Sequence, residues 1–310
     1  MFRVGALGNG SGPPVVLTSG ARLSMLRAMA LDLTLVGKSS EPVSFTYAWK
    51  DTVLYALGVG ARKDELDYLY EGHGPKVLPS FAVVPMFDPM FERVAKTGGD
   101  LSMVVHGGQS VKLHKPFAAS GTVSTVATVR AMYDMRRFAN VLIDTVTRCE
   151  KGELLAETTA SIIFRGEGNW GGEPPPKEPK VAEVPKDREP DFVIEEKTSP
   201  EQALLYRLSG DINPLHADPV FAEKVGFTQG PILHGLCTYG HMVRHVVKGA
   251  CGGKGENVLA FDAQFRKPVW PGDTIVTAGY RVDKGLFALK VTVKERDESV
   301  LTNAWARVAE

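Results

Sequence analysis

The stretch from Leu208 to Phe227 reads LSGDINPLHADPVFAEKVGF and places an aspartate, an asparagine and a histidine around one proline. Asp211 and His216 are five positions apart, which allows a carboxylate and an imidazole to approach one water molecule from different sides. Histidine titrates near neutral pH, and burial can tune a carboxyl toward the same range. The pair therefore has the residue types needed for general acid-base chemistry on water.

The elements on either side of this stretch must hold it in place. Helix-start and helix-stop signals predict one helix from Ser199 to Gly210 and a second from Asp218 to Gly226. Pro214 prevents a helix from restarting between them. A third helix, from about Pro231 to Lys248, carries one apolar face and lies between strand-like regions. We therefore expect a short, rigid connection that presents its polar side chains in a fixed geometry.

Two other interpretations of the polar stretch stay open at this point. Asp211 and Asn213 could simply cap the loop, as turn residues do, with His216 packed beneath them. Asp211, His216 and His234 could also bind a metal, although no regular ligand spacing supports a full set, and we expect none. For His234 we expect packing against the neighbouring loop.

Composition sets the broad class of protein. The chain has 310 residues, of which 44% are hydrophobic and 23% charged, as in a globular protein. No apolar run approaches the roughly 18 residues of a membrane helix, and 36 basic residues balance 36 acidic ones, so nothing favours nucleic acid as a partner. The three cysteines lack Cys-x-x-Cys spacing, which argues against disulfides and structural zinc and favours a reducing compartment: Cys149, Cys237 and Cys251.

The chain divides into two similar halves. Residues 166–190 are crowded with proline, glycine and charge, and they predict a linker. Each half carries a Lys-Pro pair, at Lys115 and Lys267, followed by strand-like alternation, which indicates a duplicated domain. We predict an extension over 1–36, a first domain over 37–165 and a second over 191–310, both of the α+β class with antiparallel strands. The extension has a composition compatible with a transit peptide or a frayed end, and the chain ends without a Ser-Lys-Leu peroxisomal signal. Cytoplasm, peroxisome and mitochondrion all stay open.

The motif YRLSGDINPLHADPVFA, residues 206–222, resembles the hydratase 2 signature of the MaoC-like enoyl-CoA hydratases. The likeness continues through GPILHGLCTYG (230–240) and FRKPVWPGD (265–273), and into the first half through YALGVGA, YEG and VHGGQSVKLHKP. This resemblance implies a double hot-dog fold, in which two curved antiparallel sheets each wrap a helix. In that family the first helix is lost over the substrate cleft, and the interrupted stretch from Gly72 to Gly99 is compatible with such a loss.

The resemblance also implies an activity, which is reversible addition of water to a trans-2-enoyl-CoA to give a (3R)-3-hydroxyacyl-CoA without a cofactor. Asp211 and His216 match the catalytic pair, and Asn213 matches a position that orients the water. Gly235 lies early in the third helix, where its free N–H could bind the thioester oxygen as negative charge develops on it. A homodimer is the family's usual assembly.

The CoA-binding residues follow from the same resemblance, since the chain has no Walker loop. The residues placed along the CoA path are His106, Gly107 and Phe265. A lysine of the family falls at Met135 here, so Arg136 or Arg137 would have to make its phosphate contact. Glu71 matches a family carboxylate near the cleft. Each of these residues also has a structural interpretation, as a surface charge or a packing position.

Three rival functions use the same fold or chemistry. A hot-dog thioesterase would use a carboxylate and water on the same class of substrate, but the spacing of Asp211, Asn213 and His216 argues against it. A non-catalytic acyl-CoA binding module would not need the catalytic pair. A dehydratase acting on carrier-protein substrates would share the chemistry, and the sequence separates it poorly from the CoA enzyme.

Overall fold

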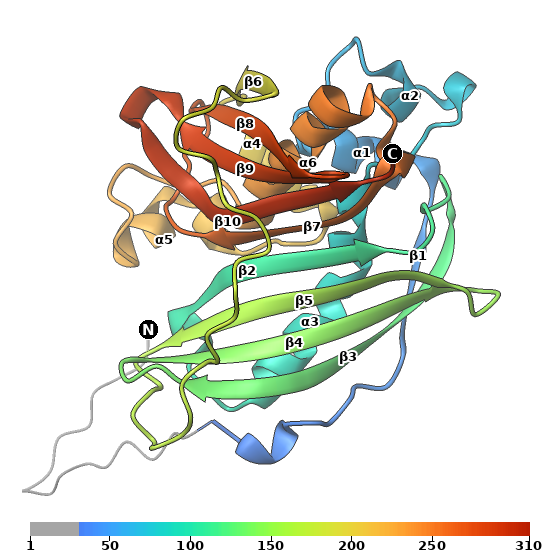
Figure 1. Cartoon of the computed structure of the whole chain (residues 1–310). Helices are drawn as coiled ribbons and strands as arrows, with labels where there is room; N and C mark the ends of the chain where they lie inside the picture. Colours follow the sequence, from blue (N-terminus) through green and yellow to red (C-terminus); the bar gives the residue numbers. More distant parts are fainter. Residues whose placement is uncertain (1–30) are drawn as a thin grey trace, which may run out of the picture.

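The computed structural model describes residues 31–310 (Figure 1). The predicted extension over 1–36 therefore lies mostly outside the described residues. The first half contains β1 (Val43–Tyr47), α1 (Trp49–Gly58), α2 (Leu66–Leu69), α3 (Val83–Lys96), β2 (Val104–Leu113), β3 (Gly121–Asp134), β4 (Phe138–Cys149) and β5 (Leu154–Arg165). The second half contains β6 (Phe192–Lys197), α4 (Gln202–Tyr206), α5 (Pro219–Lys224), α6 (Gly235–Cys251), β7 (Val258–Phe265), β8 (Thr274–Asp283), β9 (Leu286–Val293) and β10 (Glu298–Val308). Short 3₁₀ turns connect several of these elements.

All ten strands form one antiparallel sheet in the order β1-β3-β4-β5-β2-β7-β10-β9-β8-β6. Five strands come from each half, and the halves meet where β2 pairs with β7, with Gly108 opposite Gln264. Strands such as β4 alternate between buried and partly exposed residues, because only one face of the sheet packs against helices. The predicted α+β class is confirmed. The two halves share one continuous sheet instead of lying side by side as separate sheets.

Each half packs one long helix against its part of the sheet. In the first half α3 contacts β3, β4 and β5, and in the second α6 contacts β6, β7, β8 and β10. The expectation of irregular structure between Gly72 and Gly99 was wrong, because α3 occupies 14 of these residues. Met86, Met90 and Val94 recur at every fourth position of α3 and are buried. Pro89 has no N–H and cannot donate a backbone hydrogen bond inside the helix. The free energy gained by burying these side chains exceeds the cost of that missing bond.

The helices around the polar stretch begin and end close to their predicted positions, with one difference. Asp218 caps α5 by accepting hydrogen bonds from two backbone N–H groups of its first turn, and Gly210 ends the 3₁₀ turn η5 (Arg207–Ser209) that extends α4. The third helix begins at Gly235 and not near Pro231. The reason is that the N–H of Leu233 donates to the carbonyl of Val269, in the β7–β8 connection, instead of to a helical partner.

The predicted linker, residues 166–190, contains no helix or strand and crosses the outer face of the sheet (Figure 1). The carboxylate of Asp134 holds its beginning by accepting hydrogen bonds from the N–H groups of Asn169 and Gly171. In the described part of the chain, no helix has the length and apolarity needed to cross a membrane.

A buried ion-pair network, centred on Arg244 of α6, ties the two halves together. The Arg244 Nε–H donates to the carbonyl of Val59, and the guanidinium pairs with Glu65 of the first half and Glu196 of β6. Arg244 is fully buried. Burial alone would raise the pKa of Glu196, but His245 and the Arg244 charge more than offset it and hold this pKa at about 2. Arg244 is the buried cation that both carboxylates share, and Lys248 and Arg62 pair with Glu65 and Glu196 from more exposed positions.

Candidate active site

The polar stretch forms a loop between η5 and α5 whose shape is set by its own side chains. The Asp211 Oδ1 accepts a hydrogen bond of 3.2 Å from the N–H of Asn213, and the Asn213 Oδ1 accepts one of 3.0 Å from the N–H of Leu215. Asn213 thereby caps the 3₁₀ turn η6 (Pro214–His216). The capping interpretation is therefore correct for Asn213, whose side-chain oxygen is engaged in the loop.

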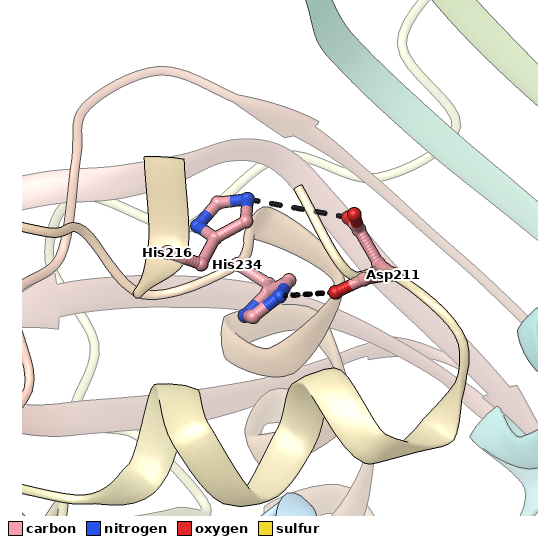
Figure 2. Close-up of side chains that lie close together, drawn as sticks. All are labelled: Asp211, His216 and His234. Carbon is pink, nitrogen blue, oxygen red and sulfur yellow. Dashed lines mark hydrogen bonds and ion pairs between the residues drawn. The ribbon is translucent and has the colours of Figure 1, made fainter. Parts of the chain in front are cut away.

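His216 has one ring nitrogen fixed by the backbone and the other directed toward Asp211. Its Nδ1 lies 2.8 Å from the carbonyl oxygen of Ile232, which can only accept, so Nδ1 carries the proton. In the neutral ring Nε2 then has a free lone pair. Figure 2 shows this nitrogen facing the Asp211 carboxylate, 4.0 Å from Oδ2. That gap is too long for a direct hydrogen bond but is suited to one bridging water.

His234 supports both members of the pair (Figure 2). Its ring stacks on that of His216 at a centroid distance of 3.6 Å, and its Nε2–H donates a 3.0 Å hydrogen bond to the backbone carbonyl of Asp211. Tyr206 contacts the same ring, with 4.9 Å between the centroids. Burial, together with the nearby His216 and Arg207, lowers the pKa of His234 to about 2. His234 is therefore neutral, and it packs against the loop as expected.

The pKa of His216 is lowered from its ordinary value, mainly by burial, while Asp211 and the bond to Ile232 oppose the shift. The neutral ring is the form that can accept a proton from water.

Since a lowered pKa keeps this form populated at more acidic pH, we expect kcat/KM to hold constant from pH 8 to below 6.5. It should then fall along a single acid limb. A pH-rate profile in buffers of constant ionic strength measures this limb. A midpoint above pH 6.5 would contradict the lowered pKa of His216.

Asp211, His216 and His234 also form the group that a metal ion would need, with one potential ligand atom of each within 4.8 Å of the others. Tetrahedral zinc with bonds of about 2.0 Å requires ligand atoms roughly 3.3 Å apart, whereas the Asp211 and His216 atoms are 4.0 Å apart. The two imidazole rings are stacked 3.6 Å apart with planes inclined by only 25°, so their lone pairs lie in two separate, nearly parallel planes and are poorly placed to meet at one ion. The set fits a water molecule better than a metal.

Gly235 lies beside this pair as the first residue of α6, with His234 as the helix cap. At this position the N–H has no partner within the helix and carries the partial positive charge of the helix start. A Cβ at Gly235 would lie 3.4 Å from the ring of Phe265. A side chain at this position would therefore contact the ring, whereas glycine leaves the start of the helix uncovered on that side.

His106 and Phe265 meet where the two halves of the sheet join. Their rings lie edge to face with centroids 5.0 Å apart, so His106, Phe265 and Gly235 form one contiguous wall. Gly107 occupies a bulge in β2, and a Cβ there would lie only 2.7 Å from Ile163. Burial lowers the pKa of His106 to about 4, so this ring is neutral. The predicted CoA-path residues are therefore connected to the start of α6: Phe265 adjoins Gly235, His106 contacts Phe265, and Gly107 follows His106 in β2.

The remaining predicted residues lie farther away. Arg136, with a φ of 64°, and Arg137 form the turn between β3 and β4, two to three strand spacings or roughly 10–14 Å from β2. Glu71 is exposed and follows α2, which is fastened to the end of α6 by the Tyr68 hydroxyl and the carbonyl of Gly253. The 17-residue length of α6 places that end roughly 25 Å from its start. Glu71 therefore lies away from the catalytic pair, and its place near the cleft stays a prediction.

A groove of about 450 Å³ is lined in part by His216. It is bordered by α4, the loop around η6 and the β7–β8 connection. Polar and apolar atoms contribute almost equally to its exposed lining, and the residues that line it are Pro200, Ala203, Leu204, His216, Ala217, Gln229, Pro231, Trp270 and Pro271. No local pattern could predict this groove, because its residues come from four separate segments.

Two family models match the chain, one in each half. Residues 45–166 match the MFE-2 hydratase 2 N-terminal domain, and residues 181–304 match the MaoC like domain. A Mycobacterium tuberculosis protein named 3-hydroxyacyl-thioester dehydratase Y is 40% identical over 276 residues, which are 87% of this chain and 94% of that protein. The chain belongs to the MaoC-like hydratase 2 family.

Other members of this MaoC-like family are similar to this chain in sequence and in structure. The peroxisomal enoyl-CoA hydratase 2 of Arabidopsis thaliana is 35% identical over 291 residues, covering 87% of this chain and 93% of its own. A crystal structure of a MaoC-like dehydratase from Phytophthora capsici superposes with a TM-score of 0.80 at 30% identity, covering 90% of this chain and 98% of that one. The ten-stranded MaoC-like architecture described above is the double hot-dog fold, as the sequence resemblance implied.

Proposed function

We propose that this protein is a hydro-lyase that adds water reversibly to trans-2-enoyl-CoA and forms (3R)-3-hydroxyacyl-CoA in fatty-acid metabolism. The observation that carries the proposal is the 4.0 Å separation of the Asp211 Oδ2 and the His216 Nε2, which face one another with room for one water. Relatives named as a thioester dehydratase and an enoyl-CoA hydratase cover nearly the whole chain and support this chemistry.

In the proposed reaction, water donates one hydrogen bond to Asp211 and one to His216. The water oxygen attacks the β-carbon and transfers a proton to the His216 Nε2, while the C=C electrons move to the α-carbon and the thioester oxygen. The same site returns a proton to the α-carbon, so water adds across the double bond with no change in oxidation state overall. The reaction therefore needs no redox cofactor, and acid-base groups of this kind contribute about 10²- to 10⁴-fold each.

The negative charge on the thioester oxygen needs a donor that is already in place. We assign this role to the Gly235 N–H, because Gly235 is the first residue of α6 and lies next to the ring of Phe265. The wall formed by His106 and Phe265 would then accompany the pantetheine arm of CoA. Both halves of one chain contribute to this site. A complete site therefore does not require the homodimer that is usual in the family. Analytical ultracentrifugation would measure whether this protein forms that dimer.

Replacing Gly235 by proline tests the backbone donor directly. Proline is tolerated at the first helical position, and His234 already has the extended conformation (φ −57°, ψ 137°) that a residue before proline prefers. Proline removes the N–H and adds ring atoms, so kcat should fall by about 10²- to 10³-fold. Gly235→Ala keeps the N–H and adds a Cβ in contact with the ring of Phe265, so it measures the steric part of this loss and should retain much more activity than Gly235→Pro. Equal kcat values for the two variants would exclude the N–H as the oxyanion donor.

The proposal itself is tested with the unmodified protein and trans-2-butenoyl-CoA (crotonyl-CoA). We expect loss of the conjugated thioester absorbance, formation of the (3R)-hydroxy product by chiral chromatography, and no release of free thiol. Thiol release would indicate a thioesterase. Binding without turnover would indicate an acyl-CoA binding module. A strong preference for the same acyl group on a carrier protein would assign the chemistry to a carrier-protein dehydratase.

A further inference from the structure

We propose that the C-terminal end of α1, in the first half, fixes the catalytic loop (residues 210–218) relative to the start of α6, and that Gln202 is the positioning residue through which it acts. This inference rests on the proposed function, because it names a residue that does not touch the water yet sets the geometry of the pair that does. The motif YALGVGA (residues 55–61) contains this end of α1.

The carbonyl oxygen of Gly58, the last residue of α1, accepts hydrogen bonds from the helix that precedes the catalytic loop and from the helix that begins beside it. Gln202 of α4 donates through Nε2 at 2.6 Å, and Cys237 of α6 donates through its S–H at 3.2 Å. The same Nε2 also donates to the carbonyl of Leu57 at 3.1 Å. The last carbonyls of a helix lack partners within it, so side chains of the second half satisfy an acceptor that α1 cannot. We call this contact of Gly58, Gln202 and Cys237 the α1 clamp.

Glycines allow this end of α1 to contact both helices closely. A Cβ at Gly58 would lie 3.3 Å from the Cα of Tyr206 in α4, and a Cβ at Gly240 of α6 would lie only 2.3 Å from the side chain of Val59. The carbonyl of Val59 accepts the Nε–H of Arg244, which also comes from α6. The end of α1 is therefore packed between α4 and α6, with little room for either helix to shift alone.

The helix α4 connects the α1 clamp to the catalytic pair through one buried ring. Tyr206 lies one turn after Gln202, and its ring contacts that of His234 with 4.9 Å between the centroids. His234 donates to the carbonyl of Asp211 and stacks on His216 (Figure 2). Gln202 and Tyr206 are both buried, so a displacement of α4 must disturb this packing. Loss of the α1 clamp should therefore loosen the 4.0 Å approach of the catalytic pair.

The position of the loop also determines how far water is kept from His216. The titratable groups that face this ring are Asp211 and His234, with Arg207 close to His234. Burial is the main cause of the lowered pKa of His216. A loosened loop admits water, so this pKa rises toward its ordinary value and the neutral base is lost at a higher pH. The acid limb of kcat/KM should then move to higher pH, which a general loss of stability would not cause.

Gln202→Met tests the α1 clamp, since methionine has a similar length and volume but donates no hydrogen bond. This variant also loses the long bond, 3.4 Å, that the Gln202 Oε1 accepts from the N–H of Ser199. Cys237→Ala removes the other donor to the Gly58 carbonyl and leaves the Ser199 bond intact. The two variants therefore approach the same carbonyl from different helices.

Thr147→Val is the matched control. Thr147 is also buried, and its hydroxyl forms one hydrogen bond of 2.9 Å with that of Thr125. It lies in β4, which β5 and β2 separate from the second half of the sheet. The three variants and the unmodified protein are compared by their kcat, KM and acid limb with crotonyl-CoA, after circular dichroism has shown that each is folded.

We expect Gln202→Met to lower kcat about tenfold or more, to change KM by less than about twofold, and to move the acid limb to higher pH. Cys237→Ala should act in the same direction with a smaller loss, and it decides the test if Gln202→Met does not fold. Thr147→Val should keep the kcat and the acid limb of the unmodified protein. Unchanged kcat in folded Gln202→Met, or a loss of kcat with an unmoved acid limb, would overturn the α1 clamp while hydration by the unmodified protein stands. Absence of hydration by the unmodified protein would overturn the proposed function as well.

Discussion

Replacing Asp211 by asparagine is expected to lower kcat for enoyl-CoA hydration by about 10²- to 10⁴-fold, with little change in KM. Asparagine has nearly the same shape and can still accept the 3.2 Å hydrogen bond from the N–H of Asn213, so the loop should keep its conformation. What is lost is the negative oxygen that faces the His216 Nε2 across 4.0 Å. Without it, the water is poorly oriented and the histidinium formed during attack is not stabilised.

Asp218→Asn is the matched control for this change. Asp218 lies seven residues away, is exposed, and uses its carboxylate only to cap α5. Asparagine caps helices about as well as aspartate, so this variant should stay within twofold of the unmodified protein. The double variant Asp211→Asn with His216→Asn should be little worse than the worse single variant, because both residues act on one water. Retention of more than a tenth of the activity in Asp211→Asn would exclude Asp211 as a catalytic group.

Replacing Arg244 by methionine is expected to lower the free energy of unfolding by about 3–5 kcal/mol. Methionine fills much of the same volume but leaves the carboxylates of Glu65 and Glu196 without their buried partner. The bond from the Arg244 Nε–H to the carbonyl of Val59 is lost as well, which removes a contact between the halves. Urea unfolding monitored by circular dichroism measures the difference.

Lys115→Met provides the comparison for an exposed ion pair. Lys115 pairs with Glu153 at 2.7 Å, but both side chains are about half exposed, so its loss should cost less than 1 kcal/mol. A triple variant that adds Glu65→Gln and Glu196→Gln to Arg244→Met should recover part of the stability, because no charge is then left buried. A loss below 1 kcal/mol in Arg244→Met alone would show that water or other cations neutralise the two carboxylates.

Local patterns in the sequence predicted the frame of the site well. The capping signals at Asp218 and Gly210 and the break at Pro214 fix the loop, because they act through neighbouring backbone groups. The Asp211 and His216 side chains approach one another because this loop is short. The predicted domain limits of 37–165 and 191–310 stay predictions, although separate family models match residues 45–166 and 181–304.

Features that depend on contacts between distant segments escaped prediction. The stack of His234 on His216 joins residues from α6 and the loop, and the Arg244 network joins three elements. The regular helix α3 was missed because its prolines suggested a break, whereas its buried face decides the conformation. Glu71 was placed near the cleft by motif similarity alone. The structure puts it next to α2, whose contact with the far end of α6 no local pattern reveals.

The pairing of β2 with β7 in one chain has a consequence for how this protein can change over generations. In a symmetric dimer of single hot-dog chains, every substitution appears twice and must be acceptable in both copies. Here the GDINPLH motif occurs once, in the second half, and the two halves match different family models. Selection can therefore reshape the first half for substrate recognition without altering the loop that carries Asp211. Covalent fusion separates the evolution of specificity from that of the catalytic chemistry.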